Sequence, residues 1–202
     1  MPSRLQALIA IAIVSLALLI GAAALILQKG GPGRVGMGEA LIGGPFSLID
    51  TQGKRVTEKD FLGKYTLIFF GYTYCPDICP TELQVMTEAL AQMGAKGEII
   101  QPVFISFDPE RDTRDTLKAY VENFGPRLIG LTGSAAEIAV AAKAYRVYYR
   151  KVESEGSTDY LMDHSSIVYL MDTRGKFVKH FSYSTDAKAM AEALAAAVSG
   201  AS

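Results

Sequence analysis

Residues 65–83 read Tyr-Thr-Leu-Ile-Phe-Phe-Gly-Tyr-Thr-Tyr-Cys-Pro-Asp-Ile-Cys-Pro-Thr-Glu-Leu and contain both cysteines of the 202-residue chain. The stretch begins as an apolar run rich in aromatic residues, which is typical of a strand buried on both faces. It then turns at the cysteines, and Pro80 favours the first turn of a helix, where its missing N–H is no loss. Because a proline disfavours helical angles at the residue before it, we expect Cys79 as the N-cap and Cys75 in the preceding loop.

From about residue 40 onwards, predicted strands and helices alternate. The strands are expected at 46–50, 54–56, 65–71, 102–107, 128–131, 167–171 and 176–181, and the helices at about 80–93, 114–123, 135–145 and 186–198. Thr113 or Asp112 can cap the second helix and Ser134 the third. This order predicts an α/β domain with a central mixed sheet and helices on both faces. Because a buried strand brings two thiols to a helix N-terminus, we expect a thioredoxin-like fold for residues 40–202.

The N-terminal region is dominated by an apolar segment, Ala7 to Leu27, that has no charged side chain. Its length matches the roughly 20 residues needed to cross the hydrocarbon core of a bilayer. Small residues at 22–24 raise the alternative of a cleaved signal peptide, but the apolar run continues beyond them. We therefore expect residues 1–28 to be an uncleaved, single-pass membrane anchor.

Residues 29–39 contain five glycines and Pro32, a composition typical of a flexible tether. The short tail before the apolar segment predicts that the large domain is translocated across the membrane. No Arg-rich and Ser-rich transit peptide precedes the segment, which favours a bacterial inner membrane, with the domain in the periplasm.

The formal net charge is −1, so the composition gives no reason to expect nucleic-acid binding. Two cysteines do not make a disulfide scaffold, and a domain of this size can bury a core without one. Two cysteines four residues apart, with none elsewhere, instead indicate a redox or metal-binding pair.

The cysteine loop alone does not separate redox chemistry from metal binding. A helix N-terminus stabilises a thiolate by about 0.3–1 kcal/mol, less than the 1.36 kcal/mol of one pKa unit, and the carboxylate of Asp77 opposes it. Strong activation therefore needs something more, such as a bound cation. The spacing of Cys75 and Cys79 places their Cα atoms about 6 Å apart, which suits either a disulfide or two sulfur ligands on one metal ion.

His164 favours the metal. The segment Asp163-His164-Ser165-Ser166 comes just before the strand at 167–171, where thioredoxin-like folds have a loop that faces the cysteines and usually carries a cis-proline. This segment has no proline, and its histidine is expected to be a third ligand instead of an ordinary surface residue. Asp163 is a candidate for orienting the imidazole, with a solvent-facing carboxylate as the alternative. Asp108 is a candidate neighbour of the site, or a simple cap or turn residue.

The segment Gly71-Tyr-Thr-Tyr-Cys75-Pro-Asp-Ile-Cys79-Pro resembles the copper motif of the Sco (SenC) copper chaperones. Residues 108–113 (Asp-Pro-Glu-Arg-Asp-Thr) and 163–165 resemble that family's next two landmarks, in the same order. The resemblance implies a thioredoxin-like fold that binds one copper ion, Cu(I) or Cu(II), through Cys75, Cys79 and His164. It also implies a role in assembling the binuclear copper centre of cytochrome c oxidase.

The ligand chemistry agrees with this expectation. Two thiolates and one imidazole suit Cu(I), and the imidazole also helps to hold Cu(II), while zinc is the competing ion. We therefore expect a membrane-tethered, non-enzymatic chaperone that delivers copper to the copper-bearing subunit of cytochrome c oxidase. A periplasmic copper donor or thiol reductant is a second expected partner. The alternative is a thiol–disulfide reductase that uses a reversible Cys75–Cys79 disulfide to keep the client's cysteines reduced.

Overall fold

The computed structural model describes residues 15–16, 42–153 and 160–200. The chain divides into two units, 1–39 and 40–202. Apart from residues 15 and 16, the predicted anchor and tether lie outside the described residues, so both stay predictions. Within the described ranges, no helix is long and apolar enough to span a membrane.

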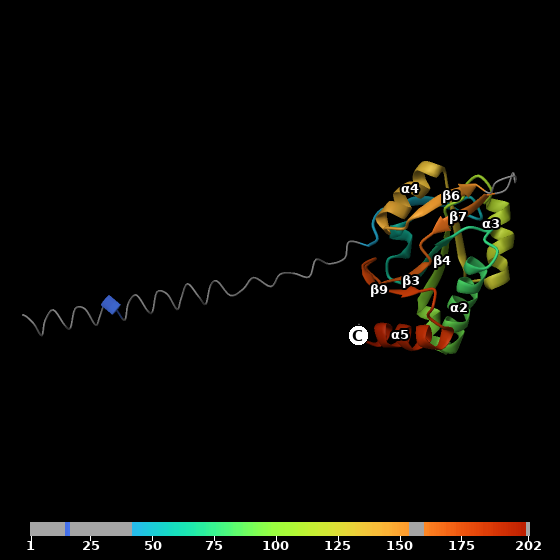
Figure 1. Ribbon diagram of the computed structural model, residues 1–202. Helices are drawn as coiled ribbons and strands as arrows, with labels where there is room; N and C mark the ends of the chain where they lie inside the picture. Colours follow the sequence, from blue (N-terminus) through green and yellow to red (C-terminus); the bar gives the residue numbers. More distant parts are fainter. Residues whose placement is uncertain (1–14, 17–41, 154–159, 201–202) are drawn as a thin grey trace, which may run out of the picture. The chain divides into compact units, whose positions relative to one another are not determined.

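The second unit is built on a seven-stranded mixed sheet with the order β2-β1-β5-β4-β3-β8-β9 (Figure 1). The strands are β1 (Ser47–Asp50), β2 (Arg55–Thr57), β3 (Tyr65–Gly71), β4 (Ile100–Ser106), β5 (Ile129–Thr132), β8 (Ile167–Met171) and β9 (Phe177–Ser182). β3, β4 and β5 are parallel to one another, whereas β1 and β8 run antiparallel to their neighbours β5 and β3. The predicted central mixed sheet is therefore confirmed.

Four α-helices flank this sheet: α2 (Ile78–Gln92), α3 (Arg114–Val121), α4 (Ala135–Ala144) and α5 (Ala187–Ser199). Short 3-10 helices lie at η1 (Glu58–Phe61), η2 (Gly94–Ile99) and η3 (Glu122–Phe124). The predicted caps are confirmed. The side chain of Thr113 accepts a hydrogen bond from the backbone N–H of Thr116, and the side chain of Ser134 accepts one from the backbone N–H of Glu137. α2 and α3 lie on one face of the sheet and α4 on the other, as Figure 1 shows. α5 packs against α2.

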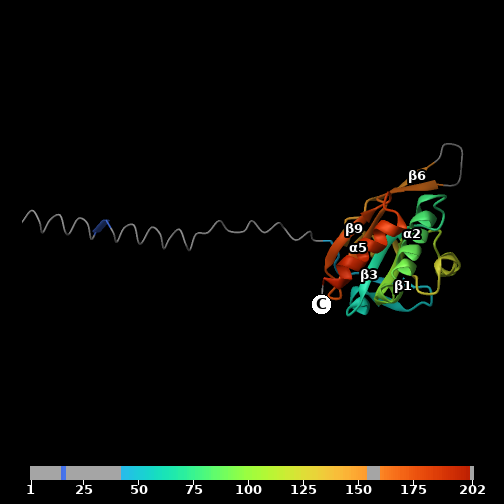
Figure 2. The same cartoon turned by 90° about the horizontal axis from the view of Figure 1, so that it is seen from below.

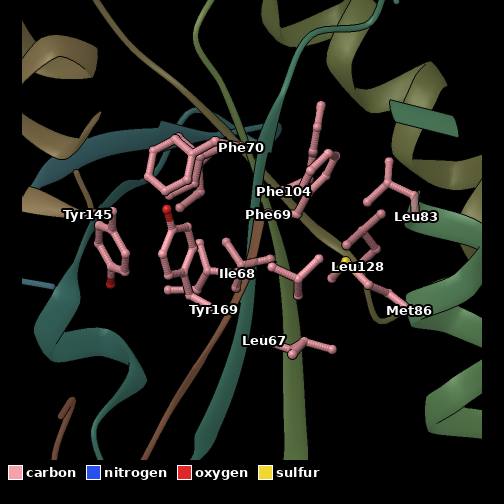
Figure 3. Close-up of a cluster of buried hydrophobic side chains, with 14 of the residues drawn as sticks. Leu67, Ile68, Phe69, Phe70, Leu83, Met86, Phe104, Leu128, Tyr145 and Tyr169 are labelled. Atoms are coloured by element: carbon pink, nitrogen blue, oxygen red, sulfur yellow. The ribbon is translucent and has the colours of Figure 1, made fainter. Parts of the chain in front are cut away.

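The central strand β3 is buried along its whole length. Its side chains alternate between two halves of the core, as Figure 3 shows. Phe70 lies with Tyr145 and Tyr169 on one side, at ring-centroid distances of 5.4 and 6.5 Å. On the other side, Leu83 and Met86 of α2 cover the sheet (Figure 3). A strand held from both faces gives the cysteine loop that follows it a fixed starting point.

Two local predictions are wrong. β6 (Tyr149–Glu153) and β7 (Tyr160–His164) form a separate antiparallel pair, set apart from the main sheet in Figure 2, so His164 ends a strand instead of lying in a loop. β6 (Tyr-Arg-Lys-Val-Glu) and β7 (Tyr-Leu-Met-Asp-His) show no regular alternation of apolar and polar residues, so the sequence signal for these strands is weak. Cys79 is also not the N-cap, because α2 begins at Ile78 with Asp77 before it. Pro80 is tolerated two positions further in, at the third residue of the helix, since the first four N–H groups of a helix have no intrahelical partner.

Candidate metal centre

The two cysteines lie where β3 ends and α2 begins. Cys79 is fully buried in the first turn of α2, whereas Cys75 is partly exposed in the preceding loop. Gly71, at the end of β3, is what allows Cys79 to sit so close to the sheet. A Cβ atom on Gly71 would lie 2.8 Å from the Cys79 sulfur and 2.7 Å from the ring of Phe104.

Hydrogen bonds give the two thiols opposite character. The backbone N–H of Cys79 donates to the Cys75 sulfur at 3.3 Å, so this sulfur satisfies one of the free N–H groups of α2. A hydrogen bond from the Cys79 thiol, aided by His164 and by the amides of Cys79 and Asp77, lowers the pKa of Cys75 to about 4 against the opposing effect of burial. The same thiol contact, together with burial, raises the pKa of Cys79. In the metal-free protein at neutral pH, Cys75 is therefore the thiolate and Cys79 carries the proton.

Asp77 contributes to this site through its backbone. Its amide is among the groups that stabilise the Cys75 thiolate. It also precedes α2 as the N-cap residue, without a capping hydrogen bond from its side chain. The expected opposition of its carboxylate to a thiolate is outweighed, because the pKa of Cys75 is lowered.

His164 faces the thiols from the end of β7. Its Nε2 lies 3.8 Å from the sulfur of Cys79, and its Nδ1 lies 3.2 Å from the carbonyl oxygen of Ser165. Since a carbonyl can only accept, a proton on Nδ1 can be donated to Ser165, which leaves Nε2 as the ring nitrogen available to a metal ion. The rings of Phe107 and Tyr72 pack against the imidazole, at centroid distances of 5.0 and 6.0 Å.

The sulfur atoms of Cys75 and Cys79 and a ring nitrogen of His164 all lie within 4.8 Å of one another. Metal–sulfur bonds of about 2.3 Å and metal–nitrogen bonds of about 2.0–2.1 Å would let one ion reach all three. Two soft sulfurs and one imidazole are ligands for Cu(I), Cu(II) or Zn²⁺. Three ligands leave coordination open at the ion, which is typical of a site that exchanges its metal or binds another group.

The structure places the two other acidic candidates in different roles. Asp163 is exposed and faces Arg150 at 3.6 Å, while the Ser165 carbonyl holds the imidazole. Of the two alternatives for Asp163, the solvent-facing carboxylate is the one found, because alternation along β7 points Asp163 and His164 to opposite faces. Asp108 is buried, and its carboxylate accepts hydrogen bonds from Arg111 and from the hydroxyl of Tyr160.

Sequence reasoning missed two neighbours of the site, Arg111 and Asp112. The guanidinium of Arg111 lies over the rings of Tyr160 and Tyr74, at 3.6 and 4.6 Å from the ring centroids. The carboxylate of Asp112 accepts hydrogen bonds from Thr73. The motif around residues 108–113 was visible in the sequence, but its partners were not, because they lie far away along the chain.

Comparisons with known proteins agree on one family. A family model described as SCO1/SenC matches residues 35–199. "Protein SCO1 homolog 1, mitochondrial" of Arabidopsis thaliana is 49% identical over 168 residues, which cover 83% of this chain and 49% of that protein. The chain thus spans about half the length of the first curated relatives that it matches.

Solved structures give the same result. The crystal structure of Arabidopsis thaliana ScoI with copper bound is 48% identical, with a TM-score of 0.75, over 79% of this chain and 99% of that one. The structure of Bradyrhizobium japonicum ScoI with copper bound is 49% identical, with a TM-score of 0.70, over 77% of this chain and 98% of that one. This likeness confirms the predicted thioredoxin-like arrangement of sheet and helices.

Proposed function

The chain belongs to the SCO1/SenC family, and on this premise we propose that it is a copper chaperone for the assembly of cytochrome c oxidase. In this proposal Cys75, Cys79 and His164 bind one copper ion, and the copper-bearing subunit of the oxidase receives it. The observation that carries the proposal is the convergence of two sulfurs and one imidazole nitrogen within 4.8 Å.

Burial at the site supports transfer of the ion instead of permanent storage. Cys79 is fully buried and would bind the ion from the protein interior, whereas Cys75 and His164 are partly exposed. A sulfur from a partner can therefore approach on the side of Cys75 and enter the open coordination position. As bonds to the partner form, bonds to the exposed ligands can break, so the ion need never be free in solution.

A metal titration of the reduced, detergent-purified full chain tests this proposal. We expect one Cu(I) per chain, loss of tight binding in Cys75→Ser and Cys79→Ser, and a larger loss for Cu(II) than for Cu(I) in His164→Ala. Cu(I) can persist on two thiolates, but Cu(II) needs the imidazole. His180→Ala is the matched control, because His180 is exposed on β9. Unchanged binding of both oxidation states in His164→Ala, or bound zinc that Cu(I) does not displace, would contradict the proposal.

The proposal includes a membrane anchor formed by the uncharged segment 7–27, followed by the glycine-rich tether 29–39. It places the domain on the periplasmic side of a bacterial inner membrane, within reach of a membrane-bound client. The protein should then stay in the membrane fraction through high-salt and carbonate washes and be digested by protease added from the periplasmic side. Recovery of a soluble chain whose N-terminus lies near residue 25 would show cleavage instead.

The low pKa of Cys75 favours a second candidate function, thiol–disulfide reduction. In this reaction the Cys75 thiolate attacks a disulfide of the client and releases one of its thiolates. Cys79 then gives its proton to the released client thiolate and attacks the mixed disulfide, so the client gains two electrons and the chain is left with a Cys75–Cys79 disulfide. An external dithiol reductant would have to restore both thiols.

One variant separates these two functions in cells. His164→Ala keeps both thiols, so a reductase should retain most of its function, whereas a copper chaperone should lose oxidase assembly. Added copper should restore part of a delivery defect by mass action but cannot replace a missing reductant. The measurement is cytochrome c oxidase activity with and without added copper. Near-normal activity of His164→Ala without added copper would favour the reductase.

A further inference from the structure

We propose that the segment Asp108–Thr113 is a two-armed clamp that positions both halves of the metal site. Asp112 holds the loop that carries Cys75, while Asp108 and Arg111 hold the β6–β7 pair that carries His164. These are positioning residues, since none of them contributes one of the three converging ligand atoms. The inference rests on the proposed copper site only for its metal-dependent test, because the clamp itself is present without metal.

The first arm fixes the cysteine loop. Asp112 is 1% exposed, and its two carboxylate oxygens accept from the backbone N–H of Thr73 at 2.9 Å and from the Thr73 hydroxyl at 2.6 Å. Ser106, at the end of β4, donates to the same carboxylate. Thr73 is two residues before Cys75, so this carboxylate sets the path of the chain between β3 and the first thiol.

The second arm fixes the β6–β7 pair. Asp108 is 2% exposed and accepts from the hydroxyl of Tyr160, the first residue of β7, at 2.6 Å. Its other oxygen accepts from Nε of Arg111 at 2.7 Å, and Nη1 of Arg111 donates to the carbonyl of Tyr160 at 2.9 Å. Tyr160 is thus held at both its side chain and its backbone. Because β7 is a paired strand of only five residues, holding its start also restricts its end at His164.

Arg111 joins the two arms. Its guanidinium is stacked on Tyr160 of β7 and also lies over Tyr74, the residue immediately before Cys75. Cation–π contacts of this kind are attractive, and more so where they are desolvated. A direct hydrogen bond also links the halves, since the N–H of Met162 on β7 donates to the hydroxyl of Tyr72 at 3.3 Å. The spacing between thiols and imidazole therefore depends on the contacts of residues 108–113 together with the direct Tyr72–Met162 hydrogen bond.

The clamp is tested first in the metal-free full chain, by amide hydrogen exchange at Thr73 and Met162. Asp112→Asn should speed exchange of the Thr73 amide by about tenfold or more and leave the Met162 amide unchanged, because the asparagine side chain has only one acceptor oxygen for the two Thr73 donors. Asp108→Asn should speed exchange of the Met162 amide and leave the Thr73 amide unchanged. Asp115→Asn is the matched control, since Asp115 is exposed on α3. Leu194→Ala in α5 is a second control, which weakens the core at the far end of the domain from β6 and β7 (Figure 1).

The second test uses copper. Asp108→Asn should shift the Cu(II) absorption and electron paramagnetic resonance spectra towards those of His164→Ala while the affinity for Cu(I) stays near that of the wild type. Asp112→Asn should lower the Cu(I) affinity as well, by about 10–100-fold, the usual effect of removing a group that supports a metal ligand. Leu194→Ala should leave the spectra unchanged, which separates positioning from a general loss of stability.

Outcomes that overturn the clamp are distinct from outcomes that overturn copper binding. If both amides exchange faster together in each variant, as in Leu194→Ala, or if neither changes, the clamp is wrong. If the wild type binds no copper, the proposed function fails, and the exchange rates still decide the clamp. Should an Asp→Asn variant not fold, Thr73→Val and Tyr160→Phe remove the hydroxyl contacts alone and are expected to give the same selective pattern in weaker form.

Discussion

Glu82 makes the stability of the domain depend on pH. It lies on α2 one turn after Cys79, its side chain is 1% exposed, and its Oε1 has no hydrogen-bond partner in the described part of the chain. Burial raises the pKa of this carboxyl from 4.5 to about 7. A buried carboxylate without a partner is costly, so the folded state favours the protonated form.

The size of the effect follows from the pKa shift. A rise from 4.5 to about 7 corresponds, at 1.36 kcal/mol per pKa unit, to about 3 kcal/mol. Between these two values the folded state binds a proton that the unfolded state has lost, so the free energy of unfolding falls as pH rises. The loss begins near pH 4.5 and is complete above pH 7. Glu82→Gln is neutral at every pH and should not show it.

Thermal unfolding of the reduced, metal-free protein at pH 4.5 and at pH 8 measures this difference. We expect wild type and Glu82→Gln to unfold at similar temperatures at pH 4.5. At pH 8 the variant should be more stable by up to about 3 kcal/mol, or about 6–12 °C. Glu88→Gln, an exposed position on the same helix, should behave as the wild type at both pH values. A difference between wild type and Glu82→Gln that does not change with pH would refute the reasoning.

Three further predictions concern the site and its support. Gly71→Ala should destabilise the domain by about 1–3 kcal/mol in urea unfolding, because the added Cβ atom would meet the Cys79 sulfur and the Phe104 ring. A variant as stable as the wild type would show that this space is open. Iodoacetamide should label Cys75 before Cys79, and the labelling rate of Cys75 should fall only as pH drops towards its pKa of about 4. Cys79→Ala should move the midpoint of this pH profile to higher pH, and labelling of Cys79 before Cys75 would show that Cys79 is the thiolate. Asp186→Ala should cost about 1 kcal/mol in the same urea assay, since its side chain caps α5, and should leave the copper spectra unchanged.

The central part of the fold could be predicted because its signals are local. The uninterrupted apolar run of β3 and its break at the cysteines are visible within residues 65–83. Thr113 and Ser134 stand directly before the helices that they cap. Each of these features is decided by neighbours within a few positions, so periodicity and capping rules are enough to find them.

The β6–β7 pair and the clamp could not be predicted, because they depend on distant contacts. Thr73 and Asp112 are 39 residues apart, and Tyr160 and Asp108 are 52 apart. Apolar and polar residues are mixed on both faces of β6 and β7, which is a weak strand signal. The side-chain periodicity of β7 would have separated His164 from Asp163, had the strand been recognised.

The same contrast applies to the three ligands. Cys75 and Cys79 are four residues apart and are placed by one turn of chain, whereas His164 is 85 residues from Cys79 and is placed by tertiary contacts alone. A local opening that releases β6 and β7 would therefore remove the imidazole and leave the two thiols together. Such openings generally cost less than global unfolding, since few contacts have to break. In the proposed copper site, two thiolates would hold Cu(I) while Cu(II) would also need the imidazole, so we expect docking of the β6–β7 pair to decide which oxidation state the site retains.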